Sequence, residues 1–256
     1  MTEPRTENVV IVTGGSRGIG AAAALRLAQP DTTVLVTYVS SPERAGEVVS
    51  QIEAGGGRAV ALQADVASED DCLRTFAEAD RIGRLTGLVN NAGVVDVAAR
   101  LTDMSVERLR RIFDINVLGT ILCAREAVRR MSTAHGGQGG AIVNVSSASA
   151  KIGSPAQYID YAAAKGAVDT FTVGLAKEVA AEGVRVNAIR PGIIDTEIHA
   201  SGGDPDRARR VAAELPMLRA GRAEECAEAI AWLLSDAASY TTGAILDVSG
   251  GRSILP

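Results

Sequence analysis

The sequence is poor in aromatic residues, histidine and cysteine, and it contains no long apolar run. Aromatic side chains make up 3% of the 256 residues, with 2 histidines and 3 cysteines. Cys72, Cys123 and Cys226 lie far apart without the paired spacing of a metal site, so we expect buried, reduced thiols and no metal. No stretch approaches the ~18 apolar residues of a membrane span, and no apolar signal segment opens the chain. We therefore expect a cytoplasmic protein without a membrane partner.

Excess positive charge is also lacking. The chain carries 26 Lys and Arg against 31 Asp and Glu, a net charge of −5, and its basic residues are scattered. Binding to nucleic acid needs a concentrated basic patch, so we expect no nucleic-acid partner. Small and apolar residues are abundant instead, with 46% hydrophobic residues and 27 glycines. This mixture suits buried parallel strands under closely packed helices, within one domain over residues 1–256.

Short β-branched runs alternate with helical stretches along the chain. We expect strands at Val9–Thr13, Thr33–Val39, Ala59–Gln63, Gly87–Asn90, Ala141–Ser146, Val184–Ile189 and Ala244–Val248. Helices are expected at Gly20–Ala28, Glu43–Ala54, Glu69–Ile82, Ser105–Met131, Ala156–Ala181 and Ala223–Leu234. Parallel strands need right-handed crossovers, which predicts an α/β fold of the Rossmann type: a doubly wound, seven-stranded, mostly parallel sheet with helices on both faces. A closed (β/α)8 barrel is the alternative, and the glycine pattern argues against it.

A glycine-rich turn, TGGSRGIG, follows the first expected strand and opens the first helix. In that position a tight turn brings the backbone close to a pyrophosphate and directs helix N–H groups at it. Gly14 permits the turn, Gly18 removes bulk near the phosphates, and Gly20 lets helix and strand pack closely. An ordinary glycine-rich loop is the alternative, but the placement after the first strand favours a dinucleotide site.

The second expected strand ends without an acidic residue. NAD sites usually place an Asp or Glu there to accept from the ribose hydroxyls, whereas this strand runs VLVTYVSS. Arg17 in the glycine turn, together with Ser40 and Ser41, supplies a cation and hydroxyl donors for a 2′-phosphate. We therefore expect NADP(H) rather than NAD(H). An arginine in an exposed loop also needs no special role, so a solvated Arg17 is the alternative.

A carboxylate closes the third strand at Asp65-Val66. Asp65 at the carboxyl edge of the sheet is able to accept a hydrogen bond from the adenine amino group. Aspartate is equally common there as a helix cap, and the sequence leaves both roles open.

Tyr161 and Lys165 are four residues apart in a helical stretch and therefore share one helical face. Unperturbed tyrosine has a pKa near ~10, and an adjacent cation lowers that pKa by stabilising the phenolate. A surface pair at ordinary helical spacing is the alternative for these two residues alone.

Several motifs occur in order along nearly the whole chain. They are TGGSRGIG at 13–20, NNAG at 90–93, Asn116, Ser146-Ser147, YxxxK at 161–165 and Pro191-Gly192. In this set and order, the sequence resembles the short-chain dehydrogenase/reductase family, including its 3-oxoacyl-[acyl-carrier-protein] reductase and glucose 1-dehydrogenase-like members.

The resemblance implies a role for each matching position. Tyr161 would donate or accept a proton, and Lys165 would lower the tyrosine pKa and hold the nicotinamide ribose. Ser147 would hydrogen-bond the substrate oxygen, and Asn116 would hold a water that links Lys165 to solvent. The residues expected to contact the cofactor are Gly14, Ser16, Arg17, Gly18, Ile19, Gly20, Ser40, Asp65, Val66, Asn91, Ala92, Gly93, Tyr161, Lys165, Pro191, Gly192, Ile194 and Thr196.

Two further segments lie near the expected site. The stretch between Ser147 and Tyr161 is about a residue longer than in many relatives, which leaves Ser146 and Ser149 as alternatives to Ser147. Residues 195–216 resemble the family's mobile substrate lid. His199 lies in that lid, and we assign it no chemistry because Tyr161 already fills the acid/base role.

The sequence thus predicts an oxidoreductase that transfers a hydride between NADP(H) and a small carbonyl or secondary alcohol substrate. Family members pair long helices across two-fold axes, so we expect a homotetramer. An NAD-dependent alcohol or sugar dehydrogenase is one alternative, and a non-catalytic dinucleotide-binding sensor is another.

Overall fold

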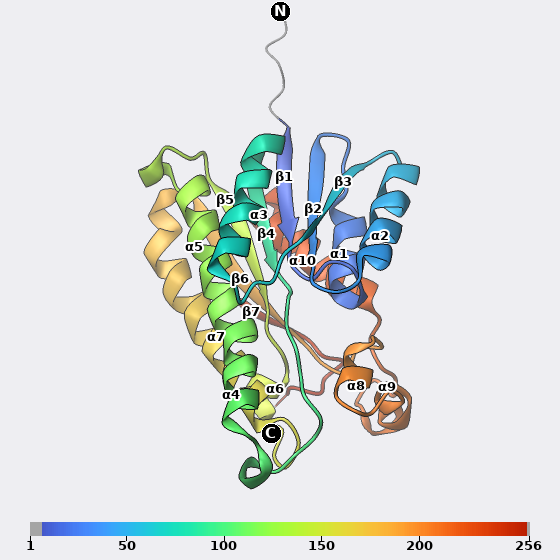
Figure 1. Cartoon of the computed structure of the whole chain (residues 1–256). Coiled ribbons are helices and arrows are strands. Elements are labelled where there is room, and N and C mark those ends of the chain that lie inside the picture. The colour runs from blue at the N-terminus through green and yellow to red at the C-terminus, as the bar shows by residue number, and fades with distance from the viewer. Residues whose placement is uncertain (1–6, 255–256) are drawn as a thin grey trace, which may run out of the picture.

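The computed structural model describes residues 7 to 254 and contains a seven-stranded sheet (Figure 1). Its strands are β1 Asn8–Val12, β2 Thr32–Tyr38, β3 Arg58–Gln63, β4 Arg84–Asn90, β5 Gly140–Val145, β6 Val184–Pro191 and β7 Ile245–Val248. The strand order is β3-β2-β1-β4-β5-β6-β7, and neighbouring strands are parallel. The predicted doubly wound fold is confirmed. The order reverses between β1 and β4, and the carboxyl ends of these strands form the crevice in which such sheets bind ligands.

Helices cover both faces of the sheet (Figure 1). They are α1 Gly18–Leu27, α2 Pro42–Ala54, α3 Glu69–Ile82, α4 Val106–Phe113, α5 Gly119–Met131, α6 Ser149–Ile152, α7 Ile159–Val179, α8 Ile198–Ser201, α9 Arg207–Arg210 and α10 Ala223–Leu234. The short helices α6, α8 and α9 gather beyond the carboxyl ends of the strands. Within the part of the chain that the structure describes, no helix has the length and apolar composition needed to cross a membrane.

Two hydrophobic clusters, one on each face, hold the helices to the sheet. One cluster joins Ile11 and Leu88 to Phe76 of α3 and to α5 and α7. The other joins Val10 and Val34, which point the opposite way, to α1, α2 and α10. Full burial of a side chain such as Phe76 contributes roughly 1.5–3 kcal/mol. The sheet is therefore buried on both faces, as its continuous apolar strands predict.

The cysteines lie where the sequence places them, on helices and buried. Cys72 is on α3, Cys123 on α5 and Cys226 on α10, and none forms a disulfide. Cys72 and Cys123 are neighbours across the α3–α5 contact, with their sulfur atoms 3.7 Å apart.

The helix expected over residues 105–131 is interrupted. A π-helical turn, Asp114–Leu118, separates α4 from α5, and the Gly119 N–H donates to the carbonyl of Asp114. A Cβ on Gly119 would lie 2.7 Å from Val66 Cγ2, so glycine lets α5 pack closely against the loop after β3. The interruption falls at Asn116, in keeping with the frequent placement of π turns at functional sites.

The segment before α7 also differs from the expectation. The helix expected from Ala156 begins at Ile159, because Ser154 and Ala156 have positive φ angles of 43° and 56°. Such angles do not continue a right-handed helix and are costly for residues with a Cβ. Residues 195–216, expected to be irregular, contain the short helices α8 and α9.

Candidate active site

The glycine turn between β1 and α1 forms one end of a cavity of about 520 Å³ at the carboxyl edge of the sheet. Gly14 and Gly18 have φ angles of 61° and 54°, which favour glycine. A Cβ on Gly18 would lie 3.3 Å from Thr196 Cγ2, so the missing side chain leaves a narrow cradle between the turn and the loop after β6. Asn91 ties the turn to β4 by donating to the carbonyls of Thr13 and Gly14, each at 2.9 Å.

Most of the predicted cofactor residues line this cavity. They are Gly14, Ser16, Arg17, Gly18, Ile19, Ser40, Asp65, Val66, Asn91, Ala92, Gly93, Tyr161, Lys165, Pro191, Gly192, Ile194 and Thr196. Gly20 lies outside the cavity wall, packed against Asn91 and the backbone of Gly14, which is the helix-packing role its position suggests. The cradle at Gly18 and the donors around it fit the phosphates of a nicotinamide dinucleotide.

Asp65 projects into the loop that leads to α3. Its Oδ1 accepts from the Ala67 N–H at 3.0 Å, and its own N–H donates to Asp71 Oδ2 at 2.8 Å. Ser68 is the residue that caps α3, accepting from the Asp71 N–H. Asp65 is therefore not the helix cap, and its role toward adenine stays a prediction.

Tyr161 and Lys165 lie near the start of α7, at the other end of the cavity. The Lys165 ammonium is 5.6 Å from the centre of the Tyr161 ring and donates to the carbonyl of Val145 at 2.8 Å. Burial raises the pKa of Tyr161 to about 12, partly opposed by the Ser147 hydroxyl. Burial also lowers the pKa of Lys165 to about 8 against the attraction of Asp169. The lowering by Ser147 is smaller than the raising by loss of solvation, and the expected lowering of the tyrosine pKa by Lys165 stays a prediction.

The three candidate serines have different surroundings. Ser146 is buried and donates to the carbonyl of Lys165 at 3.2 Å. Ser147 lines the cavity, and its hydroxyl acts on the pKa of Tyr161. Ser149 accepts from the Ser154 hydroxyl at 3.0 Å, outside the cavity wall. The geometry favours Ser147 as the serine that faces a substrate.

Asn116 is fully buried in the π-helical turn, and its side chain is committed to neighbouring backbone. Its amide nitrogen donates to the carbonyls of Val94 and Ile112 at 3.0 and 2.9 Å, and its Oδ1 accepts from the Val94 N–H at 3.2 Å. A Cβ on Gly93 would lie 2.8 Å from Asn116 Oδ1 and 3.3 Å from Lys165 Nζ. Gly93 thus allows Asn116 and Lys165 to approach the turn after β4. The expected water link through Asn116 stays a prediction.

The lid segment closes the cavity from the side of β6. His199 Nε2 lies 2.9 Å from the carbonyl of Ile194, and burial lowers the histidine pKa. The Tyr158 hydroxyl donates to the carbonyl of Gly202 at 3.3 Å, which connects the lid to the loop before α7. These contacts hold the lid to the loop after β6 and to the loop before α7.

Other residues of the cavity were not anticipated from the sequence. Arg111 on α4 and Ile115 in the π turn line it, and Arg111 pairs with Asp96 at 2.9 Å. Thr37 on β2 also lines it, and its hydroxyl accepts from the Gly14 N–H at 3.2 Å. Motif spacing carries no signal for these residues, because the fold brings them in from separate elements.

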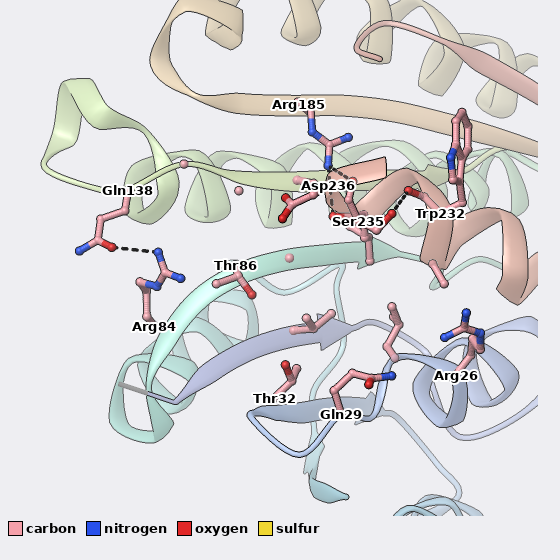
Figure 2. Close-up of a pocket in the computed structure, with 18 of the residues that line it drawn as sticks. Arg26, Gln29, Thr32, Arg84, Thr86, Gln138, Arg185, Trp232, Ser235 and Asp236 are labelled. Atoms are coloured by element: carbon pink, nitrogen blue, oxygen red, sulfur yellow. Dashed lines mark hydrogen bonds between the residues drawn. The ribbon is translucent and has the colours of Figure 1, made fainter. Parts of the chain in front are cut away.

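A larger cavity, about 840 Å³, lies at the opposite, amino-terminal edge of the sheet (Figure 2). Its arginines are bonded to carboxylate, amide or backbone oxygens, and Arg26 pairs with Glu228 at 2.7 Å. Arg84 donates to Gln138 at 2.9 Å, and Arg185 donates to the carbonyl of Leu233 at 2.7 Å, at the end of α10. The residues that line it include neither a glycine turn that opens a helix nor a tyrosine–lysine pair, so this cavity is a poor candidate for the reaction.

Known proteins with similar sequences support the expected resemblance to oxidoreductases. A family model described as Enoyl-(Acyl carrier protein) reductase matches residues 14–253. "Uncharacterized oxidoreductase YgfF" of Escherichia coli is 52% identical, over 95% of this chain and 99% of its own. "Glucose 1-dehydrogenase 2" of Bacillus subtilis is 38% identical, over 100% and 98%. "3-oxoacyl-[acyl-carrier-protein] reductase" of Synechocystis is also 38% identical, over 96% and 97%.

Solved structures of oxidoreductases are also similar to this chain. A short-chain dehydrogenase from Burkholderia cenocepacia, in complex with NADP, has a TM-score of 0.88 and 34% identity, over 98% of this chain and 100% of that one. A dehydrogenase/reductase from Sinorhizobium meliloti has a TM-score of 0.89 and 34% identity, over 97% and 96%. With its sheet order, its glycine turn and its Tyr161–Lys165 pair, this chain belongs to the short-chain dehydrogenase/reductase family of oxidoreductases.

Proposed function

We propose that the protein is an NADP(H)-dependent oxidoreductase that reduces a ketone or 3-oxoacyl group to a secondary alcohol, with Tyr161 as the proton donor. One observation carries this proposal. The glycine turn and Ser147, Tyr161 and Lys165 line one cavity, so a dinucleotide bound at the turn and a proton donor share one space.

Tyr161 donates the proton. When bound, the reduced nicotinamide supplies the hydride, and its oxidised form accepts one in the reverse reaction. As hydride reaches the carbonyl carbon, the C=O π electrons move to oxygen, which takes the Tyr161 proton. A pKa of about 12 keeps the phenol protonated at neutral pH, the form that reduction requires. Ser147 donates a hydrogen bond to the same oxygen and stabilises its developing charge.

Lys165 positions the cofactor and supports proton transfer. One of its three N–H donors is used by the carbonyl of Val145, which fixes the ammonium beside Tyr161. The remaining donors are available for the hydroxyls of the nicotinamide ribose. Asn116 and Gly93 set how closely the turn after β4 approaches this ammonium.

The preference for NADP(H) rests on the end of β2. Val39, Ser40 and Ser41 follow the strand without a carboxylate that would repel a 2′-phosphate, and Arg17 is exposed beside them. The structural neighbour from Burkholderia cenocepacia is a complex with NADP. Arg17→Ala is expected to weaken NADPH binding while leaving NADH binding unchanged.

We also propose that the protein forms a homotetramer in the cytoplasm. Exposed apolar side chains occur on two helical surfaces: Phe113 and Ile121 on α4 and α5, and Trp232 on α10, with Leu246 on the neighbouring β7. Two such patches suit the two interfaces of a tetramer with two-fold axes. Light scattering coupled to size-exclusion chromatography would give four times the 26.4 kDa chain mass.

A substrate panel tests the function. Relatives include proteins named for a sugar, a hydroxycyclohexanecarboxylate, a 3β-hydroxysteroid and a 3-oxoacyl thioester. Oxidation of NADPH and NADH should therefore be followed with β-ketothioesters, cyclic ketones and ketosteroids, and the reverse reaction with sugars and secondary alcohols. Turnover of a ketone with NADPH, and much slower turnover with NADH, is the expected result. Faster turnover with NADH would overturn the cofactor assignment.

A further inference from the structure

An ion pair joins α2 to the lid segment beside the proposed cofactor cavity. Arg44 lies in the first turn of α2, three residues after Ser41, which lines the cavity with Ser40. Its Nη1 is 3.0 Å from Oε1 of Glu197, which lies between Thr196 and α8. The two residues are 153 positions apart, and neither was singled out by a motif in the site.

The Glu197 carboxylate lies beside the glycine turn. A Cβ on Gly18 would be 3.9 Å from Glu197 Oε2 and 3.3 Å from Thr196 Cγ2. A fixed negative charge here adjoins the backbone that is suited to bind phosphates. Glu197 is therefore placed to compete with an anionic ligand for Arg44.

The strength of the ion pair determines which ligands are able to displace Glu197 from Arg44. Both side chains are 48% exposed, and exposed ion pairs change an equilibrium by only about fivefold or less. A phosphate monoester carries a charge of about −1.5 to −2 at neutral pH and forms bidentate hydrogen bonds with arginine. A 2′-phosphate is thus able to take Arg44 from Glu197. A neutral 2′-hydroxyl is not, because it offers no charge in exchange.

We propose that Arg44 and Glu197 act together as a cofactor selector, in which a 2′-phosphate displaces the lid carboxylate from Arg44. When the phosphate binds, it replaces Glu197 as the partner of Arg44 because its charge is larger. The Glu197 end of the lid is then released from α2. A dinucleotide with a free 2′-hydroxyl leaves the ion pair in place and gains nothing from Arg44. This inference rests on the proposed use of NADP(H).

Direct binding measurements test the selector without turnover. The dissociation constants of NADPH and NADH are measured by nicotinamide fluorescence for wild type, Arg44→Gln, Glu197→Gln and the double variant. Arg44→Gln should raise the dissociation constant of NADPH about tenfold, as expected for loss of one charged hydrogen-bonding partner. The dissociation constant of NADH should stay within about twofold of the wild-type value. Glu197→Gln should tighten NADPH about threefold, within the range of an exposed ion pair. In the double variant the effect of Glu197→Gln on NADPH should vanish, because Arg44 is no longer there to be released.

Controls separate the pair from general charge effects. Glu78→Gln removes a carboxylate from the exposed pair with Arg81 on α3 and should leave both dissociation constants unchanged. Calorimetry with adenosine 2′,5′-bisphosphate and AMP repeats the comparison without the nicotinamide. Two results would show that the selector is wrong while the proposed function stands, provided that wild type favours NADPH. In one, Arg44→Gln weakens the binding of NADPH and NADH equally. In the other, Glu197→Gln tightens NADPH binding as much in the Arg44→Gln background as in wild type. If wild type favours NADH, the cofactor assignment and the selector both fall.

Discussion

Arg108 on α4 holds both carboxylate oxygens of Asp160, the residue immediately before Tyr161. The two hydrogen bonds measure 2.7 and 3.3 Å, and the side chains are 11% and 1% exposed. A third donor of Arg108 reaches the carbonyl of Val97 at 2.6 Å. One guanidinium thereby connects α4, the start of α7 and the loop after β4, which are the elements around Tyr161.

Removing the charge of Asp160 should destabilise the protein. Asp160→Asn keeps the side-chain volume but leaves Arg108 without its buried counter-charge, which costs about 3–5 kcal/mol. Urea unfolding followed by circular dichroism measures the change in free energy. Glu78→Gln, which breaks an exposed pair, should cost less than about 1 kcal/mol. A change of similar size in both variants would refute a structural role for the Arg108–Asp160 pair.

Gly93→Ala should slow catalysis without abolishing folding. The new Cβ would lie 2.8 Å from Asn116 Oδ1 and 3.3 Å from Lys165 Nζ, so one of these groups must move. Displacement of a positioning group typically costs on the order of 10- to 100-fold in rate, and we expect kcat to fall within that range. Gly46→Ala is the matched control, because its Cβ meets nothing within 4 Å in α2. It should raise stability by about 0.5–1 kcal/mol and leave kcat unchanged. Unaltered kcat in Gly93→Ala would argue against this packing.

Lys165 should make stability depend on alkaline pH. Burial lowers its folded pKa to about 8 from 10.5, so between those values the unfolded chain binds more protons than the folded one. Stability contributed by this group therefore rises as pH increases. The free energy of unfolding of wild type minus that of Lys165→Met should rise by about 2 kcal/mol from about pH 8 to about pH 10. A difference that stays flat or falls over this range would contradict the burial of a charged Lys165.

Single alanine substitutions should distinguish the three serines. Ser147→Ala removes the donor that we propose faces the substrate oxygen and should lower kcat on the order of 10²- to 10³-fold. Ser149→Ala should leave kcat within about threefold, because Ser149 contacts Ser154 outside the cavity and loss of such a bond costs only about 1 kcal/mol. Ser146→Ala should mainly lower stability, by about 1 kcal/mol, through loss of its bond to the Lys165 carbonyl. A larger loss of kcat in Ser149→Ala than in Ser147→Ala would reassign the role.

Local sequence patterns predicted most of the fold. The strands were readable because β-branched runs separated by helical stretches are typical of buried parallel sheets. The helix over 105–131 was predicted as continuous because its composition is helical throughout, and no local signal marks the π turn at Asn116. The late start of α7 follows from positive φ angles at Ser154 and Ala156, two residues that ordinarily avoid them.

The chemistry of the site was less predictable from spacing alone. The Tyr161–Lys165 spacing indicated proximity, but the direction of the tyrosine pKa depends on burial by the surrounding fold. Contacts between distant segments, such as Arg44 with Glu197 and Arg111 with Asp96, also follow from the tertiary structure. Sequence motifs therefore predicted the glycine turn and the Tyr161–Lys165 pair, which the structure places in one cavity, while the other residues of that cavity required the structure.

The central claim is that Tyr161 donates the proton in an NADPH-dependent reduction. The most direct test is single-turnover reduction of the best ketone of the panel by NADPH, comparing wild type with Tyr161→Phe. We expect the phenylalanine variant to bind NADPH as tightly as wild type but to transfer hydride at least about 100-fold more slowly, the usual contribution of a positioned acid. Equal rates in the two proteins, with equal NADPH affinity, would contradict it.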